Sequence, residues 1–181
     1  MSLDISMLSN HLKTYYQSID ALVLTKMIKM TPFGVISYIF HMIHQLYAIA
    51  TSKLVLIDGY CIAVSALNHK RETVFIQMWH ALGAIKKFGY QTIGKTSGSD
   101  ARTAEIMRMH KNYDYVLCAG KATARHFCEG FNVIEDKIKY IGLPRIDYIK
   151  AVSENNCEIK KALNTENGKK NILYAPTFRN G

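Results

Sequence analysis

The sequence predicts the α/β fold class, with a Rossmann-like, mostly parallel sheet. Short apolar or β-branched runs alternate along the chain with helical segments, which is the pattern of βαβ units. Three of these runs end at glycine turns, at Gly59, Gly120 and Gly142. The composition is that of an ordinary globular domain, because 49% of the 181 residues are hydrophobic and 20% are charged.

Residues 1–50 are expected to form an N-terminal helical region. The apolar stretch 31–51 is interrupted by His41, His44 and Gln45. A membrane span needs about 20 predominantly apolar residues, so this stretch predicts an amphipathic or buried helix. A position on a membrane surface stays open as an alternative. The two histidines share a helix face, but no third metal ligand is apparent, and a metal site is not predicted.

A Rossmann-like domain is expected over residues 51–150. Its strands are predicted from apolar or β-branched residues at 53–57, 73–78, 115–118 and 139–141.

Two helices of this domain follow from capping and periodicity. Ser97 and Asp100 have capping-box spacing, which predicts a helix that runs to about Lys111. A second helix is expected after the Gly120 turn. Its core-facing stripe has i, i+3, i+4, i+7 spacing and consists of Ala124, Phe127, Cys128 and Phe131.

The last part of the sequence predicts the start of another domain. Residues 151–170 are rich in Asn, Glu and Lys and are expected to form a polar helix and linker. Residues 171–174 then begin a fresh strand, so 171–181 are interpreted as the start of a missing domain, and the chain as truncated.

The net charge of +9 favours anionic partners, such as nucleic acid, anionic lipid or a polyphosphate chain. A nucleic-acid module is a minor interpretation, because no RNP-like or zinc-finger pattern is present. The four cysteines make no CxxC pair and no zinc spacing, which favours a reducing, cytoplasmic setting. No signal peptide is evident in the first twenty residues.

The most informative segment, TVFIQMWHALGAIKKFGY, covers residues 73–90. It places His80 at the carboxyl end of a predicted strand, where open α/β sheets bind their ligands. Imidazole is a natural proton acceptor near neutral pH, so His80 is a candidate general base. A buried histidine bonded to a backbone carbonyl is the alternative. Lys86 and Lys87 follow as candidate anion-binding residues, and one of them is expected to lie on a solvated face.

Two later turns carry candidate phosphate-binding residues. Pro144 fixes the turn after the strand at 139–141, and Arg145 can offer a bidentate fork to phosphate. Asp147 could orient Arg145, or the two could form an ion pair that stabilises the loop. Thr177 and Arg179 follow the last predicted strand and also suit a phosphate.

Residues 89–96, GYQTIGKT, fit the P-loop pattern, and residues 54–58, LVLID, resemble a second NTP-binding segment. A P-loop must follow a strand directly and open a helix. Here Lys86, Lys87 and Phe88 precede the segment, and helix-capping residues come only after Ser97. A P-loop NTPase is therefore the weaker alternative.

Four segments resemble a known family. QMWHALGAIKKFGY is similar to the QTWHG-type segment of bacterial CDP-glycerol glycerophosphotransferases, which build teichoic-acid-type polymers of the cell wall. YDYVLCAGKATARHFCEGFNV, GLPRID and ILYAPTFR then agree in the same order, so the resemblance covers about residues 50–181. Ala81 departs from the glycine that often follows the family's histidine.

The resemblance implies a two-domain GT-B-type transferase, of which this chain would be the acceptor-side domain. The implied reaction moves glycerol phosphate from CDP-glycerol to a hydroxyl of a polyol-phosphate or lipid-linked acceptor. It needs no cofactor or metal, and takes place in the cytoplasm at the inner face of the membrane. His80 would take the acceptor's proton, with Lys86, Arg145, Asp147, Thr177 and Arg179 as substrate- or phosphate-binding residues. A non-catalytic remnant that binds polyanion or membrane is the alternative.

Overall fold

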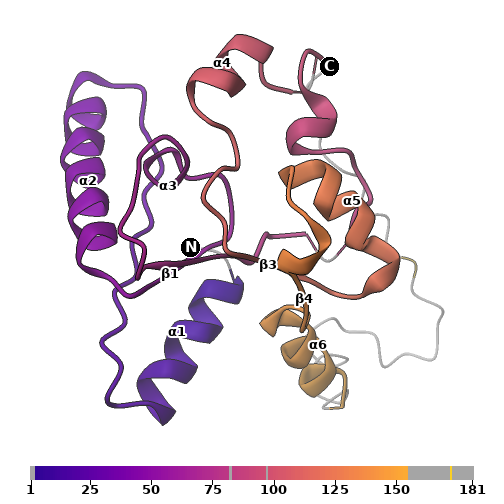
Figure 1. The fold of residues 1–181 in the computed structure, drawn as a ribbon. Helices are drawn as coiled ribbons and strands as arrows, with labels where there is room; N and C mark the ends of the chain where they lie inside the picture. Colours follow the sequence, from indigo (N-terminus) through magenta and orange to yellow (C-terminus); the bar gives the residue numbers. More distant parts are fainter. Residues whose placement is uncertain (1–2, 82, 97, 155–171, 173–181) are drawn as a thin grey trace. The chain divides into compact units, whose positions relative to one another are not determined.

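The computed structural model describes residues 3–81, 83–96, 98–154 and 172 (Figure 1). Within them, four strands form one sheet in the order β1-β2-β3-β4, and every pairing is parallel. The α/β class and the parallel sheet are confirmed. The strands are β1 (Leu54–Ile57), β2 (Val74–Gln77), β3 (Tyr115–Cys118) and β4 (Ile138–Tyr140).

The chain divides into two compact units, Met1–Arg145 and Ile146–Gly181. The sheet and five helices lie wholly in the first unit, whereas α6 (Pro144–Glu154) begins at its end. The other helices are α1 (Leu3–Tyr15), α2 (Pro32–Thr51), α3 (Ile62–Ser65), α4 (Ala101–Ile106) and α5 (Lys121–Phe131), with 3₁₀ turns η1 (Gly89–Thr92) and η2 (Glu135–Lys137).

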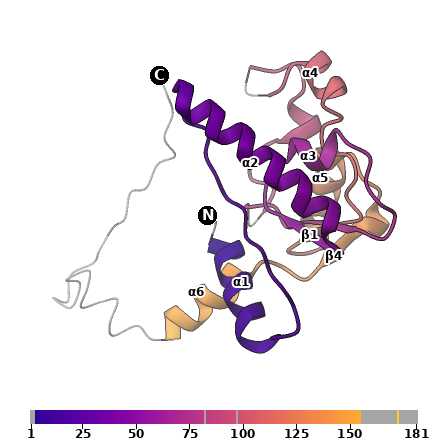
Figure 2. The same cartoon turned by 90° about the vertical axis from the view of Figure 1, so that its left-hand side faces the viewer.

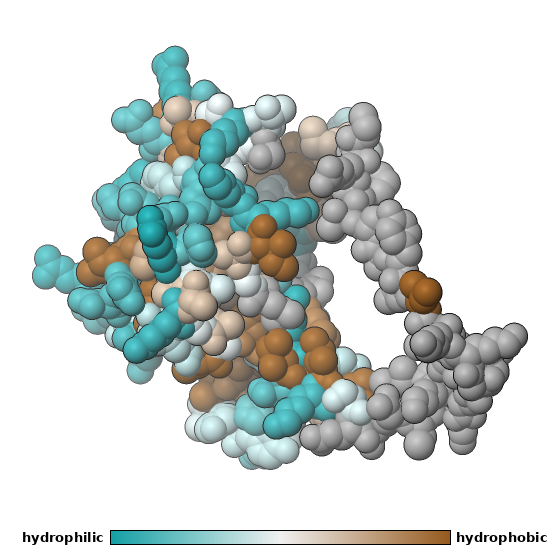
Figure 3. Space-filling model, turned by 90° about the vertical axis from the view of Figure 1, so that its right-hand side faces the viewer, coloured by the Kyte–Doolittle hydropathy of each residue, from teal (hydrophilic) through white to brown (hydrophobic). Residues whose placement is uncertain are grey.

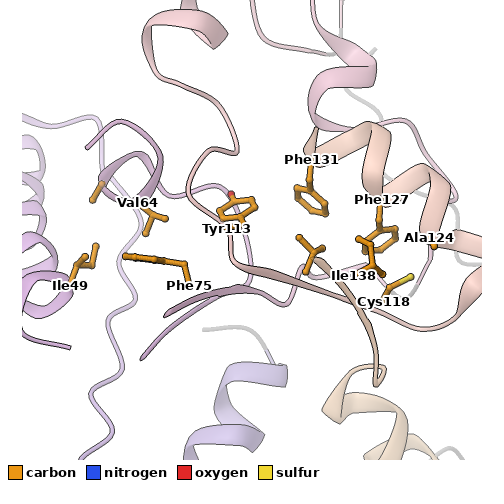
Figure 4. Close-up of a cluster of buried hydrophobic side chains, with 11 residues drawn as sticks. Ile49, Val64, Phe75, Tyr113, Cys118, Ala124, Phe127, Phe131 and Ile138 are labelled. Carbon is orange, nitrogen blue, oxygen red and sulfur yellow. The ribbon is translucent and has the colours of Figure 1, made fainter. Parts of the chain in front are cut away.

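The core lies between the sheet and the helices drawn above it in Figure 1, α3 and α5. The expected stripe of α5 is buried at Ala124, Phe127 and Phe131, while Cys128 is half-buried. The side chains of Phe127 and Phe131 point toward the sheet in Figure 4 and, with Ala124, belong to a continuous apolar cluster. Other members of the cluster are Ile49, Val64, Phe75, Tyr113, Val116, Cys118 and Ile138.

Helix α4 is shorter than predicted, and its cap differs. Asp100 itself is the N-cap and accepts a hydrogen bond from the Thr103 backbone N–H (2.9 Å). The helix ends at Ile106, not near residue 111. Arg108 and Asn112 have positive φ values of 48° and 71°, which a continuing helix excludes. Their side chains instead donate to backbone carbonyls just after α3 and at its end.

The segment after β4 also differs from its prediction. Pro144 opens helix α6, so Arg145 and Asp147 lie in the first turn of a helix and not in a loop. Most of the predicted linker and the last predicted strand, with Thr177 and Arg179, lie outside the described residues.

Helix α2 is capped by the Thr31 hydroxyl, which accepts from the Gly34 backbone N–H (3.1 Å). Among the residues of this described helix, only Ile49 is buried. Of the two predicted forms, amphipathic or buried, the buried one is therefore wrong. Its length and composition alone would allow it to cross a membrane, with a mean hydropathy of 1.3. Figure 2 shows it as a long, straight helix at the edge of the first unit.

The surface around α5 is more hydrophilic than the exposed face of α2. In Figure 3, hydrophilic side chains there surround separate hydrophobic ones. The exposed residues of α5 include Lys121, Arg125, His126 and Glu129, and Arg125 forms an ion pair with Glu129 (2.9 Å). The surface around α5 is therefore mainly hydrophilic, in contrast to the exposed apolar face of α2.

Candidate functional site

His80 lies just beyond β2, at the carboxyl edge of the parallel sheet, as the sequence predicts. Its side chain is exposed, and its Nδ1 lies 3.0 Å from the backbone carbonyl oxygen of Asp58, which follows β1. A carbonyl oxygen can only accept, so Nδ1 donates. A neutral His80 therefore carries its proton on Nδ1 and keeps the lone pair of Nε2, which is the form that a general base requires.

The backbone turns sharply at Trp79, immediately before the histidine. Trp79 has φ of +59°, a left-handed conformation that is a genuine outlier for a bulky side chain. Its indole stacks on Phe88 (centroids 4.9 Å apart) and meets Phe131 edge-on (5.2 Å). These contacts anchor the turn in the core, and the rings of Trp79 and His80 lie 4.2 Å apart.

An open pocket of about 600 Å³ lies beside His80. Aromatic side chains supply part of its wall, and Lys87 supplies a cation. The lining residues are Tyr60, Trp79, His80, Lys87, Phe88, Gly89, Thr92, Gly98, Ser99, Met109 and His110. The pocket combines a free imidazole nitrogen, hydroxyls and one ammonium group, which suits a hydroxylated anionic ligand.

The second histidine of the pocket, His110, was not predicted as a site residue. It is 5% exposed, and its Nδ1 lies 3.0 Å from the hydroxyl of Tyr113. Burial lowers the pKa of His110 to about 4 and raises the pKa of Tyr113 to about 12, so both groups are neutral at pH 7. His110 lies in the segment that is predicted to be helical to about Lys111, and nothing in that segment indicates that it lines a pocket.

Neither Lys86 nor Arg145 lines the pocket beside His80. Lys87 lines the pocket, whereas Lys86 is exposed and is not among the lining residues. The predicted partner of Arg145 is wrong: its backbone N–H and its guanidinium bond to the carboxylate of Asp4, and not to Asp147. Asp4 is fully buried and the Arg145 side chain is 22% exposed, so α1 and the start of α6 share an ion pair.

The P-loop pattern has a different local structure here. Strand β2 ends at Gln77, well before Gly89, and the pattern begins with the 3₁₀ turn η1. Gly89 has φ of +54°, and a Cβ there would lie 2.1 Å from the carbonyl oxygen of Gly130. Gly89 therefore allows this segment to pack closely against α5. Lys95 donates to the carbonyl of Gln91 (2.9 Å).

The described residues contain no group of three or more His, Cys, Asp or Glu side chains that could hold a metal ion.

Two solved structures share the fold of this chain. The structure of the wall teichoic acid polymerase TagF matches with a TM-score of 0.66 and 21% sequence identity, over 98% of this chain and 45% of that chain. A variant of TagF soaked with CDPG matches with a TM-score of 0.63, over 96% and 44%. The chain thus has a GT-B-type α/β fold.

The family follows from the sequence comparison. Residues 1–181 match the family of CDP-glycerol:poly(glycerophosphate) glycerophosphotransferases, and the chain belongs to this family. A teichoic acid ribitol-phosphate primase of Bacillus spizizenii is 38% identical over 152 residues, which are 81% of this chain and 38% of that protein. A teichoic acid glycerol-phosphate primase of Bacillus subtilis is 34% identical over 140 residues, 77% and 36% respectively. The chain therefore spans well under half the length of these relatives.

Proposed function

We propose that this chain is the acceptor-side part of a transferase that moves glycerol phosphate from CDP-glycerol to a hydroxyl of a polymer or lipid-linked acceptor. The observation that carries the proposal is the exposed His80, whose Nδ1 is bonded to Asp58 and whose Nε2 is left as a proton acceptor beside an open pocket. Membership of the glycerophosphotransferase family supplies the substrate class.

In the proposed reaction, His80 Nε2 takes the proton of the acceptor hydroxyl while the hydroxyl oxygen forms a bond to the β-phosphorus of CDP-glycerol. The bond from that phosphorus to the bridging oxygen breaks, and CMP leaves with the electron pair. The proton then passes from His80 to solvent. Phosphoryl transfer depends mainly on positioning and charge neutralisation, so this chain's part is to orient the acceptor and remove its proton.

Cations are proposed to neutralise the donor's phosphates. Lys87 is in the pocket wall and is added to the predicted set. Asp4 already neutralises Arg145, which weakens the attraction of its guanidinium for phosphate. The predicted phosphate- or substrate-binding residues remain Lys86, Arg145, Asp147, Thr177 and Arg179.

The first prediction tests the general base in a completed enzyme, made by fusing this chain to a matching donor domain and called the full-length protein below. His80→Ala is expected to lower kcat by roughly 10²–10⁴-fold, which is the usual contribution of positioned proton transfer. Its thermal midpoint should change little, because the His80 side chain is exposed. CMP release and the thermal midpoint are measured on the same preparation.

His126→Ala is the matched control, since His126 is an exposed histidine on α5 and does not line the pocket. It should keep full activity. A His80→Ala protein that is destabilised but nearly as active per folded molecule contradicts the assignment. Full-length wild-type protein that releases no CMP would favour the alternative, a remnant that only binds polyanion or membrane.

We also propose that the protein is cytoplasmic and lies on the anionic inner face of the cell membrane through α2. Five large apolar residues of α2 follow i, i+3, i+7, i+10, i+14 spacing and share one face. Each is more than half exposed: Phe33, Ile36, Phe40, Ile43 and Tyr47. An exposed apolar stripe on a chain of net charge +9 suits the interface of an anionic bilayer.

A further inference from the structure

Gln77 is a fully buried polar residue at the centre of the sheet's carboxyl edge. It is the last residue of β2 and is paired with Ile57 of β1 and Val116 of β3. The backbone ladder between β1 and β2 ends one residue later, where the Met78 N–H donates to the Ile57 carbonyl (2.7 Å). A buried amide at this point needs partners for its donor and its acceptor.

The Gln77 side chain bonds to backbone groups of the two segments that leave the sheet, and it also bonds to the Tyr113 side chain. Its Nε2 donates to the carbonyl of Gly59 (2.9 Å), and its Oε1 accepts from the N–H of Trp79 (2.8 Å). A carbonyl can only accept and an N–H can only donate, so the orientation of the amide is fixed by its partners. The side chain thus bridges the two strand exits beyond the last ladder bond.

The two bridged segments are the ones that orient His80. Gly59 follows Asp58, whose carbonyl receives the Nδ1 proton of His80. Trp79 precedes His80 and has the strained φ of +59°. A conformation of this kind persists only where its surroundings hold it in place. The Gln77 amide is in direct contact with it through the Trp79 N–H.

We propose that Gln77 is the positioning residue of the general base: its side-chain amide holds the Asp58–Gly59 and Trp79–His80 segments at the separation that keeps Nδ1 of His80 on the Asp58 carbonyl. This inference rests on the proposed function for its catalytic consequence, although the positioning itself can be measured without any activity. Few side chains could replace the amide. An ionised carboxylate could not donate to Gly59, and an apolar side chain would do neither.

The experiment reads the tautomer of His80 from its ring ¹⁵N chemical shifts in the 181-residue chain at neutral pH. In the wild type, His80 is expected to have its proton on Nδ1. Gln77→Met keeps a similar volume but makes neither hydrogen bond, and the Nε2–H tautomer should then appear. Gln77→Asn keeps an amide that is one methylene too short to reach both groups, and it replaces Gln77→Met if that variant does not fold.

Asn112→Leu is the control for general destabilisation. The Asn112 side chain also bonds backbone carbonyls, of Val64 (2.8 Å) and Leu67 (2.7 Å), and these lie outside the two segments that Gln77 bridges. It should lower the thermal midpoint and leave the His80 tautomer unchanged. An unchanged tautomer in the Gln77 variants overturns the proposal, and so does an equal change in Asn112→Leu.

A second measurement uses the full-length protein. Gln77→Met is expected to lower kcat by about 10²-fold, the effect of a small misplacement of a reacting group, with the KM for CDP-glycerol unchanged. An unchanged kcat despite an altered tautomer overturns the catalytic consequence. Failure of the proposed function is separate, because it shows as an active His80→Ala protein while the tautomer result stands.

Discussion

Two histidines of one pocket differ in their surroundings and in what they can do. His80 is exposed, and its ring is held through one nitrogen by a backbone carbonyl. His110 is enclosed by Tyr113, Phe131 and Trp79, with ring centroids between 4.9 and 6.5 Å away. Only the first can reach an acceptor from solvent without rearrangement. His110 is an uncharged part of the pocket wall.

The buried His110 predicts how stability depends on pH. Its pKa is lowered from 6.5 to about 4, so the folded chain binds this proton more weakly than the unfolded chain. The free energy of unfolding therefore falls as the pH drops from 6.5 toward 4, by about 3 kcal/mol in total from this residue. His110→Gln should flatten this part of the profile, measured by urea denaturation at several pH values.

The exposed His126→Gln serves as the control and should keep the wild-type pH dependence. A His110→Gln protein whose unfolding free energy falls between pH 6.5 and 4 as steeply as the wild type contradicts a buried, neutral His110.

The sequence pointed to His80 because its position depends on local order: a β-branched strand, then a histidine. It did not point to Asp58, Gln77 or His110, whose roles come from contacts between segments. Asp58, which bonds His80, lies 22 residues away from it in sequence, and Gly59, which bonds Gln77, lies 18 residues away. The Asp4–Arg145 pair spans 141 residues, and no local pattern predicts such a pairing.

At the scale of elements, α2 has a single buried residue, Ile49, along its 20 residues. An apolar face of this size needs a partner or an interface, and the element-scale prediction concerns that interface. Phe33→Ser combined with Phe40→Ser should weaken binding to vesicles that contain anionic lipid by roughly 30- to 700-fold. Each phenyl side chain that leaves the bilayer interface costs roughly 1–2 kcal/mol.

Vesicle co-sedimentation at several lipid concentrations measures this binding. The matched control is Ile134→Ser with Ile141→Ser, which removes two exposed apolar side chains outside α2. Equal losses in both double variants would point to general hydrophobicity and not to α2. Strong binding to neutral vesicles, with no gain from anionic lipid, would contradict the electrostatic part of the proposal.

The strands could be predicted to within about one residue, because each is a short apolar run that ends at a turn. The residues predicted for β3 are those observed, and β4 begins one residue earlier than expected. Helix α4 could not be predicted in the same way. Its end is determined by hydrogen bonds that Arg108 and Asn112 make to residues 64–68, which outweigh local helix propensity.

At the scale of the whole molecule, the relation to longer relatives gives a further prediction. The 152 residues that align with the ribitol-phosphate primase are 38% of that protein, and the 140 that align with the glycerol-phosphate primase are 36% of it. Orientation of both reactants supplies much of an enzyme's rate, so the segment alone is expected to release CMP from CDP-glycerol far more slowly than about 1 per second. Turnover at or above that rate, with a primer present, contradicts this expectation.

The order of the strands across the sheet, β1-β2-β3-β4, is also their order along the chain. Each strand that leaves the ribosome therefore meets an edge that is already formed, and no strand has to insert between two others. Assembly of the sheet can follow translation, in which the N-terminal part of a chain folds first. The Asp4–Arg145 pair can form only after residue 145 has emerged, because its two partners lie 141 residues apart in the chain.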